Sequence, residues 1–394
     1  MHEPIPVLMY HSIAPTIEGW AFDYLSIHPD AFEDHISTLA GAGYVPVTLS
    51  DLFEYMAGKR RLPPRAVIFT FDDGYLDNWV FAFPIMRKHG FKGTVFASTD
   101  FVDRRDDARP NLDDVLQGRA KHEELNWRGF LSATEMKHML LSEVMDIQGH
   151  CKTHTWYFNS PEIVDFHHPG DKRPWLAWNV RPERKPLYLE EDQSGFVRWG
   201  APVYGHTEAV RARRYFPDPR VEKDLGDYVE ARGGAGFFDQ PGWRAELADV
   251  ASGLLKADLN DRYETPDERM TRLREEIALS RQELESLLGK RIEFLCWPNG
   301  AYDDAAIEVA GQSGYLAWTL SSGDRGSKKN VPGEDPRWIR RTAASPWWYF
   351  RGKKVCTLDG DMLKHILDEY KGFTFAGMRL KWLKLGKLIR SRLF

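Results

Sequence analysis

The feature that most constrains the fold is a regular alternation of short apolar runs with longer segments of helical periodicity. The runs expected as strands are 7–10, 45–48, 67–71, 94–97, 144–147, 292–296, 316–320 and 338–341. The segments expected as helices are 30–40, 77–89, 134–141, 267–288 and 304–312. Strands that alternate with helices favour βα units, so we predict an α/β fold whose parallel sheet closes as a barrel.

Chemically active side chains follow several of the predicted strands. His11, Asp72, Asp73, His150 and Pro298 all fall just past a strand end. Barrels of this type carry their chemistry at the C-terminal ends of the strands. Because successive side chains of an extended segment point to opposite sides, the adjacent Asp72 and Asp73 are expected to have different roles.

A second motif, His150-x-x-x-His154, follows the predicted strand 144–147. An Asp-Asp-Gly triplet alone is typical of turns, and most histidine pairs are surface or core residues. Here, however, the two motifs follow two predicted strands of the same alternating chain. One carboxylate and two imidazoles in that setting favour a metal site with three protein ligands and one open coordination position. Asp73, His150 and His154 are the predicted ligands. This set suits zinc, although other divalent transition metals bind similar ligands.

The composition limits the classes of protein to which the chain can belong. The chain has 394 residues, of which 42% are hydrophobic and 28% charged, and its net charge of -5 gives no reason to expect a nucleic-acid partner. Three cysteines without a Cys-x-x-Cys spacing argue against a disulfide framework and favour a reducing compartment. The N-terminus lacks the pattern of a signal peptide, and no stretch approaches the roughly 20 apolar residues of a membrane span. We therefore expect a cytoplasmic protein.

Three regions are expected along the chain. Residues 1–157 and 265–350 should form the barrel. Residues 158–264, rich in Pro, Gly, Trp, Arg and Tyr, interrupt the alternation. A structureless loop of that length is improbable in a compact domain. We expect a folded insertion, either a lid or substrate platform, or else a peripheral subdomain that only packs.

The third region, 360–394, is a basic amphipathic tail. From Lys371 onward it holds seven basic and no acidic residues, interleaved with Leu, Ile, Met and Trp. Such a pattern favours a helix on anionic lipid, peripheral to the inner face of the cell membrane. The alternative is a C-terminal helix docked on the barrel.

Three segments together resemble the motifs of a known family. They are Thr70-Phe71-Asp72-Asp73-Gly74, the pair His150 and His154, and Phe294-Leu295-Cys296-Trp297-Pro298-Asn299-Gly300-Ala301-Tyr302. The chain resembles the polysaccharide deacetylases of carbohydrate esterase family four. The third segment and the opening Val7-Leu8-Met9-Tyr10-His11-Ser12 are similar to the branch around the poly-N-acetylglucosamine deacetylases. The resemblance covers about 1–157 and 265–345.

The resemblance implies a distorted (β/α) barrel and a set of roles. Asp73, His150 and His154 would bind Zn²⁺ or another divalent transition metal, and Asp72 would be the general base for a water molecule activated by that metal. The metal and a backbone donor would hold the oxyanion. The Asn299 N–H is the candidate donor, because Pro298 has none.

The chain departs from the family pattern in several places. Asn299 stands at a position that is often Tyr in the family. Trp297 stands before Pro298, where the family usually carries an arginine that orients the base. An arginine of 337–341 is expected to replace it; Arg340 is the candidate, but the sequence leaves the choice open. The late Leu-x-His of the general acid is missing. His11 is expected to be that acid or a neighbour of the base, and the alternatives are His167, His168 and His206 of the insertion. His365 lies too far along the chain to take that place. Cys151 is expected to be structural.

The predicted function is a metal-dependent deacetylase that hydrolyses the N-acetyl group of an amino sugar. Its expected substrate is a glycan or a lipid- or nucleotide-linked glycan precursor of a surface polysaccharide or lipopolysaccharide. The alternative is a catalytically silent barrel that binds carbohydrate. A glycosidase ranks last, because flanking a glycosidic bond requires carboxyls roughly 5–9.5 Å apart on opposing sides of the sugar.

Overall fold

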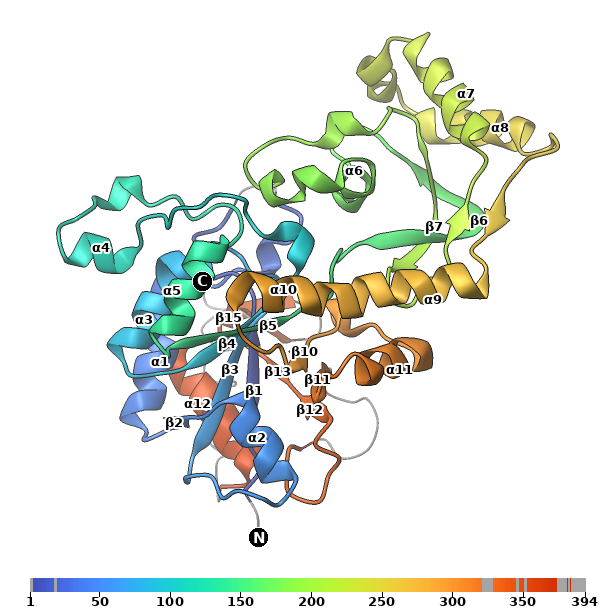
Figure 1. Cartoon of the computed structure of the whole chain (residues 1–394). Coiled ribbons are helices and arrows are strands. Elements are labelled where there is room, and N and C mark those ends of the chain that lie inside the picture. Colours follow the sequence, from blue (N-terminus) through green and yellow to red (C-terminus); the bar gives the residue numbers. More distant parts are fainter. Residues whose placement is uncertain are drawn as a thin grey trace. The chain divides into compact units, whose positions relative to one another are not determined.

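The computed structural model describes residues 3–17, 20–320, 329–344, 347–350 and 353–373, together with Lys381 and Leu383. The chain divides into two compact units. Unit 1 comprises Met1–Cys151, Arg281–Gly300 and Gly314–Phe394, and unit 2 comprises Lys152–Ser280 and Ala301–Ser313. Figure 1 labels the elements of both units.

Unit 1 is built on a parallel sheet. In spatial order its strands are β12 (Trp338–Arg340), β11 (Ala317–Leu320), β10 (Phe294–Leu295), β5 (Met145–Gly149), β4 (Gly93–Ala97), β3 (Ala66–Phe71), β1 (Val7–Tyr10) and β13 (Thr342–Ala343), with β2 (Val45–Pro46) beside β3. All of these pairings are parallel. The predicted strands therefore form one sheet with their carboxyl ends at the same edge.

The two ends of this sheet are joined by one short segment. Strands β12 and β13 lie at opposite ends of the strand order, yet only Arg341 separates them in the sequence. The Arg341 N–H donates to the Leu320 carbonyl of β11 (3.2 Å), and the Ala344 N–H donates to the Met9 carbonyl of β1 (3.0 Å). The segment thus pairs with both edges, and the sheet becomes a nearly closed barrel without long unpaired edges.

Helices follow the strands of unit 1. They are α1 (Pro29–Gly41), α2 (Leu49–Met56), α3 (Phe83–Lys88) after a π-helical turn η2 (Asn78–Ala82), α4 (Leu112–Leu116), α5 (Ala133–Leu141), α10 (Ser280–Leu288, from Arg281 in this unit) and α12 (Gly360–Lys371). Capping boxes start α2, at Thr48 and Asp51, and α5, at Ser132 and Glu135, which satisfies backbone donors of their first turns. The strand pair β14 (Trp347–Phe350) and β15 (Lys353–Thr357) is antiparallel.

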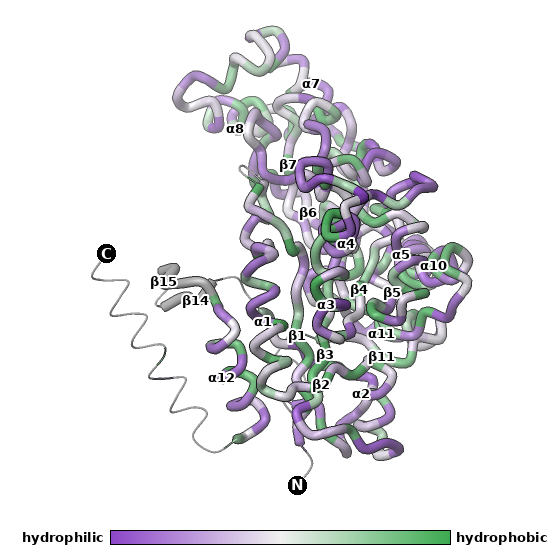
Figure 2. Tube along the Cα trace, turned by 90° about the vertical axis from the view of Figure 1, so that its left-hand side faces the viewer, coloured by the Kyte–Doolittle hydropathy of each residue, from purple (hydrophilic) through white to green (hydrophobic). Residues whose placement is uncertain are grey.

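Helix α12 packs against α1, as Figure 2 shows. His35 of α1 contacts the Leu358 carbonyl just before α12 (Nε2···O 2.8 Å), and Tyr44 donates to Asp368 (2.9 Å). Lys371, which the sequence placed in the basic tail, is buried and donates to Glu3 (2.6 Å). The first part of the predicted tail is therefore a docked helix. Apart from Lys381 and Leu383, residues 374–394 lie outside the described part of the chain.

Unit 2 has a hydrophobic core of its own. Its strands are β6 (Trp156–Phe166), β7 (Pro202–Glu208), β8 (Tyr215–Phe216) and β9 (Arg262–Tyr263), and its helices are α6 (Trp175–Val180), α7 (Pro219–Glu230), α8 (Trp243–Leu254), α9 (Pro266–Arg274), the π-helical η8 (Glu275–Leu279) and α11 (Asp304–Gln312). Strands β6 and β7 pair antiparallel, as do β8 and β9. A cluster around Leu225, Phe237 and Leu247 is buried between α7 and α8. The predicted insertion 158–264 lies within this unit; its role as a lid or platform stays a prediction.

The predicted barrel is confirmed, and each of the eight predicted strands overlaps an observed one. The predicted helix 267–288 is present as the successive elements α9, η8 and α10. β13 and the hairpins of unit 2 were not among the predicted elements. Among the described residues, no helix combines the length and the apolar character that crossing a bilayer requires.

Candidate active site

The two adjacent carboxylates at the end of β3 have different surroundings. The Asp72 N–H donates to the Tyr10 carbonyl (3.0 Å), which keeps Asp72 in register with β1. The chain then turns, because Asp73 and Gly74 both adopt left-handed conformations, with φ of 73° and 72°. At Gly74 a β-carbon would lie 3.3 Å from that of Ala97, so a larger residue would be crowded as well as strained. The turn therefore gives Asp73 different partners from those of Asp72.

Asp72 is held by a two-pronged ion pair with Arg341. Nη1 and Nη2 of Arg341 donate to Oδ1 (2.6 Å) and Oδ2 (2.7 Å) of Asp72, and both side chains are buried. Nη1 also donates to Thr70 Oγ1 (3.1 Å), and Nη2 lies 3.0 Å from Cys296 Sγ. Burial by itself raises the pKa of Asp72, but the charge and hydrogen bonds of Arg341 outweigh it and hold that pKa below its usual range. Asp72 is therefore a carboxylate at neutral pH.

His11 directly follows β1, the strand that pairs with β3. Its Nε2 is 3.8 Å from Asp72 Oδ2. Burial lowers the pKa of His11, while the charges of Asp72 and Asp73 oppose that shift only partly. Its backbone is fixed by Asn78, whose Nδ2 donates to the His11 carbonyl (2.9 Å). The predominant form at neutral pH is thus the neutral imidazole, which donates a proton only weakly.

Next along the loop, Ser12 and Ile13 are tied to the buried Asp77. Ser12 Oγ and the Ile13 N–H donate to its carboxylate (2.7 and 2.9 Å). Burial raises the pKa of Asp77 to about 6. The loop after β1 is therefore fixed to the turn that carries Asp72 and Asp73.

His150 is oriented by contacts at both ring nitrogens. Its Nδ1 lies 2.8 Å from the Cys296 carbonyl, and its Nε2 lies 3.1 Å from Asp73 Oδ1. The ring is buried, and burial lowers its pKa, but Cys296 and the hydrogen bond to Asp73 raise that pKa well above its ordinary value. A carbonyl partner at one nitrogen is the arrangement that aims the other nitrogen of a ligating histidine. A proton and a metal would compete for Nε2.

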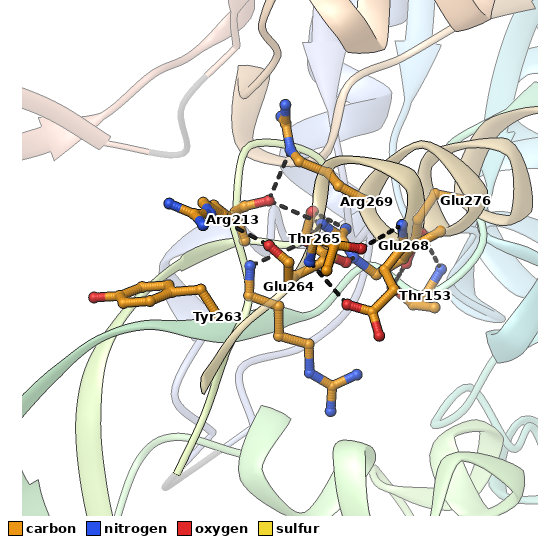
Figure 3. Close-up of polar contacts among 12 residues, drawn as sticks. Thr153, Arg213, Tyr263, Glu264, Thr265, Glu268, Arg269 and Glu276 are labelled. Carbon is orange, nitrogen blue, oxygen red and sulfur yellow. Dashed lines mark hydrogen bonds and ion pairs between the residues drawn. The ribbon is translucent and has the colours of Figure 1, made fainter. Parts of the chain in front are cut away.

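The loop of the second histidine is anchored through Thr153. The unit boundary falls between Cys151 and Lys152, so His154 is described with unit 2. The Thr153 N–H and Oγ1 donate to Glu276 Oε2 (3.0 Å) and Oε1 (2.5 Å), and Lys185 Nζ donates to the Thr153 carbonyl (2.8 Å). Figure 3 shows Thr153 and Glu276 in this network. All polar groups of the residue before His154 are thereby occupied, although His154 itself has a left-handed φ of 41°.

The third motif forms the turn after β10. Cys296, Trp297 and Pro298 are buried, and the Trp297 ring lies near that of Trp318 (6.4 Å between centroids). Asn299 is exposed and adopts a left-handed φ of 53°. Trp297 is thus a core side chain, and the oxyanion role of the Asn299 N–H stays a prediction.

The structure places Arg341 rather than Arg340 at Asp72. Arg340 sits one residue earlier, and its backbone N–H and carbonyl bond to the side chain of Asn330 (2.9 Å each). Side chains alternate along a strand, so Arg341 shares the face of Ile339, which belongs to a core cluster with Cys296. The candidate Arg340 is therefore not the partner of the carboxylate.

The other acid candidates have partners elsewhere. His167 contacts Asp171 (3.2 Å) and the Ser194 carbonyl (3.0 Å), and His206 contacts the Tyr204 carbonyl (2.9 Å). His168 lies 3.2 Å from Arg244 in the same unit 2, and His365 lies on α12. His11, by contrast, lies 3.8 Å from Asp72 within unit 1.

Sequence reasoning missed Cys296 and Glu276 and left Arg341 unassigned. Asp72, His150 and Cys296 each offer a potential ligand atom, and these atoms lie within 4.8 Å of one another. The position of Cys296 at the end of the predicted strand 292–296 is the sequence feature that could have identified it as a site residue. No sequence feature identifies Glu276 as a residue of the site, because it lies in the middle of a predicted amphipathic helix.

Comparison with known proteins agrees with this geometry. Residues 59–168 and 260–318 match the family model described as polysaccharide deacetylase. These ranges contain Asp72, Asp73, His150, His154 and Cys296, and they include strands β3, β4, β5 and β10 of the barrel. The chain therefore contains a polysaccharide deacetylase domain, which these residues form.

Several individual proteins are similar to parts of the chain. Over 92 residues it is 34% identical to "Putative polysaccharide deacetylase YxkH" of Bacillus subtilis (strain 168), a match that covers 23% of this chain and 31% of YxkH. Over 118 residues it is 26% identical to the poly-beta-1,6-N-acetyl-D-glucosamine N-deacetylase of Escherichia coli (strain K12), which covers 30% of this chain and 17% of that protein. The chain thus spans less than a third of the length of either curated relative.

Two solved structures share the fold. A de-N-acetylase from Aggregatibacter actinomycetemcomitans matches with a TM-score of 0.52 and 18% identity, covering 89% of this chain and 98% of that one. The BpsB deacetylase domain from Bordetella bronchiseptica matches with a TM-score of 0.51 and 18% identity, covering 86% of this chain and 95% of that one. At this identity the matches establish the barrel fold.

The anchoring of Thr153 gives a testable prediction. Replacing Glu276 by Gln removes the charge and one of the two acceptor oxygens, so at least one Thr153 donor loses its partner. We expect amide hydrogen exchange of residues 151–156 to become at least about 10-fold faster, corresponding to a loss of about 1.4 kcal/mol in local stability. The neighbouring Glu275, which is exposed, provides the control variant Glu275→Gln. Equal exchange in both variants would show that Glu276 does not fix the loop.

Proposed function

We propose that this chain is a metal-dependent carbohydrate deacetylase that removes the N-acetyl group from an amino sugar in a glycan or glycan precursor. The observation that carries the proposal is the division of the two carboxylates after β3. Asp72 pairs with Arg341 and Asp73 faces His150. One acid is thus available as a base while its neighbour is available as a ligand. The polysaccharide deacetylase domain supports the same reaction class.

The donor set fits a divalent metal held by Asp73, His150 and His154. Asp73 Oδ1 and His150 Nε2 lie 3.1 Å apart in unit 1, and His154 of the His-x-x-x-His motif is the proposed third ligand. Two imidazoles and one carboxylate suit Zn²⁺, with other divalent transition metals as alternatives. When bound, such an ion polarises the acetyl carbonyl and lowers the pKa of a coordinated water.

The chain's own residues supply the proton transfers. Asp72 is the proposed general base: it accepts a proton from the attacking water, and Arg341 keeps it ionised until then. His11 is the proposed partner in returning a proton to the leaving amine. Because its pKa is lowered, it would first have to gain the proton released in the reaction rather than carry one beforehand. The Asn299 N–H is the proposed oxyanion donor.

The substrate class and the cellular site are further parts of the proposal. The E. coli relative is named for poly-beta-1,6-N-acetyl-D-glucosamine, so an N-acetylglucosamine polymer or a lipid- or nucleotide-linked precursor of a surface polysaccharide is the proposed substrate. A protein that binds carbohydrate without turnover is the alternative. The altered third motif and the missing Leu-x-His favour this alternative, whereas the guanidinium of Arg341 beside Asp72 supplies the charge that the altered motif lacks.

Metal content tests the proposed site directly. We expect about one divalent ion per wild-type chain and less than about 0.1 in the double variant His150→Ala/His154→Ala, because two of three ligands are gone. Elemental analysis of the purified chain after reconstitution measures both. The double variant His167→Ala/His206→Ala, changed at histidines of unit 2 outside the predicted ligand set, is the control. Absence of metal from the reconstituted wild type would contradict the proposal.

The general base is tested by Asp72→Asn. Since the amide cannot accept the proton, acetate release from N-acetylglucosamine oligosaccharides should fall roughly 10²–10⁴-fold while metal content stays unchanged. A carbohydrate-binding protein without turnover would show no acetate release in either form. Unchanged turnover in the variant would assign the base elsewhere.

The ion pair predicts a shift in pH dependence. Arg341 lowers the pKa of Asp72, so Arg341→Met should raise that pKa, and the acidic limb of the kcat/KM profile should move to higher pH. Arg341→Lys should move the limb less, because it keeps the charge. Arg340→Met is the matched control and should leave the limb in place. A limb that moves equally in the Arg340 and Arg341 variants would argue against this assignment.

The tail is proposed to bind an anionic membrane surface from the cytoplasmic side. After the buried Lys371, the residues to 394 carry six basic side chains and no acidic one. Deletion of 374–394, which leaves α12 intact, should move the protein from the membrane pellet to the supernatant. Partitioning that does not change on deletion would refute the membrane role.

A further inference from the structure

Unit 2 contains a pocket that the proposed chemistry does not use. Its volume is about 190 Å³, and all of its lining residues belong to unit 2. Aromatic side chains from three elements line it: Tyr157 and Phe158 of β6, Trp175 of α6 and Phe216 of β8. The Trp175 ring is fixed by Phe158 and His206, with centroids 5.8 and 4.7 Å away. The pocket is therefore a built aromatic cavity.

The same pocket holds Arg214, whose guanidinium has no polar partner among the described residues. The Arg214 guanidinium lies over the Tyr157 ring (4.3 Å) and the Phe216 ring (4.7 Å). Its backbone bonds to Glu264, but within the part of the chain that the structure describes the guanidinium has no hydrogen-bond acceptor and no ion-pair partner. The nearby Arg272, by contrast, pairs with Glu264 (2.7 Å). A half-buried charge without an acceptor is costly, so Arg214 is poised for an acceptor that a ligand brings.

A carboxylate completes the polar groups of the pocket. Glu222, on the first turn of α7, lines it from an exposed position. Among the described residues, Glu222 also lacks a hydrogen-bond or ion-pair partner, and it does not pair with Arg214. The guanidinium of Arg214 therefore offers hydrogen-bond donors, and the carboxylate of Glu222 offers an acceptor, to the same ligand.

We propose that this pocket is a second carbohydrate site, separate from the Asp72 site, which binds one pyranose ring of a glycan. The C–H face of a pyranose stacks on aromatic rings, the planar guanidinium donates to two neighbouring oxygens, and the carboxylate accepts from a hydroxyl. An acyl chain would leave both charges unsatisfied, and a phosphate would be repelled by Glu222. The choice of a sugar as the occupant rests on the proposed deacetylase function.

Binding is tested on the full chain carrying His150→Ala/His154→Ala, which disables the proposed metal site. The probe is a tetramer of β-1,6-linked N-acetylglucosamine, titrated by calorimetry. Adding Arg214→Met should weaken binding at least about 10-fold, because a charged donor to the ligand is lost. Glu222→Gln should weaken it as well, and its exposure makes misfolding a minor concern. Arg232→Met is the matched control, since Arg232 also stacks on a tyrosine of unit 2 (Tyr228, 3.5 Å) but does not line the pocket.

The outcomes separate this site from the proposed reaction. Loss of affinity in the Arg214 and Glu222 variants with full affinity in the Arg232 variant supports the pocket, whether or not the wild type releases acetate. Acetate release by the wild type together with equal affinity in all three variants would overturn the pocket and leave the deacetylase in place. No binding of the tetramer at millimolar concentration would also overturn it.

Discussion

The ion pair between Asp72 and Arg341 links the closure of the barrel to its proposed chemistry. Arg341 is the residue at which one strand passes from pairing with β11 to pairing with β1. Its side chain turns into the core, where a guanidinium requires an acceptor, and Asp72 is that acceptor. Breaking a buried pair on one side leaves an uncompensated charge, so fold and site depend on the same contact.

This contact also explains how two adjacent aspartates acquire different properties. Asp72 is buried and ionised beside a fixed cation, whereas Asp73, after a left-handed turn, meets His150. Positive φ angles recur in the other motif loops, at Cys151, His154 and Asn299. Such conformations persist where the surrounding structure determines them, as the contacts of Thr153 with Glu276 and Lys185 do for the loop of His154.

The sequence predicted the barrel because strand and helix periods are local properties. Burial on both faces makes the strand 66–71 a continuous apolar run, and the capped, amphipathic α1 and α5 carry their own periodic signal. The hairpins of unit 2 were not predicted, since β6 and β7 are partly exposed and carry a mixed pattern. The length of the insertion indicated only that the segment should be folded.

By itself the sequence determined the fold class and the residue types at the strand ends, including Asp72, Asp73, His150 and His154. Only the tertiary structure decided which arginine serves Asp72, because Arg340 and Arg341 differ by one position and the side-chain period of a strand is two. Which of the two arginines faces Asp72 depends on how β12 pairs with β11 and how β13 pairs with β1. Likewise, Glu276 meets Thr153 across a sequence separation of 123 residues. Contacts of that kind leave no local pattern, since they arise from packing alone.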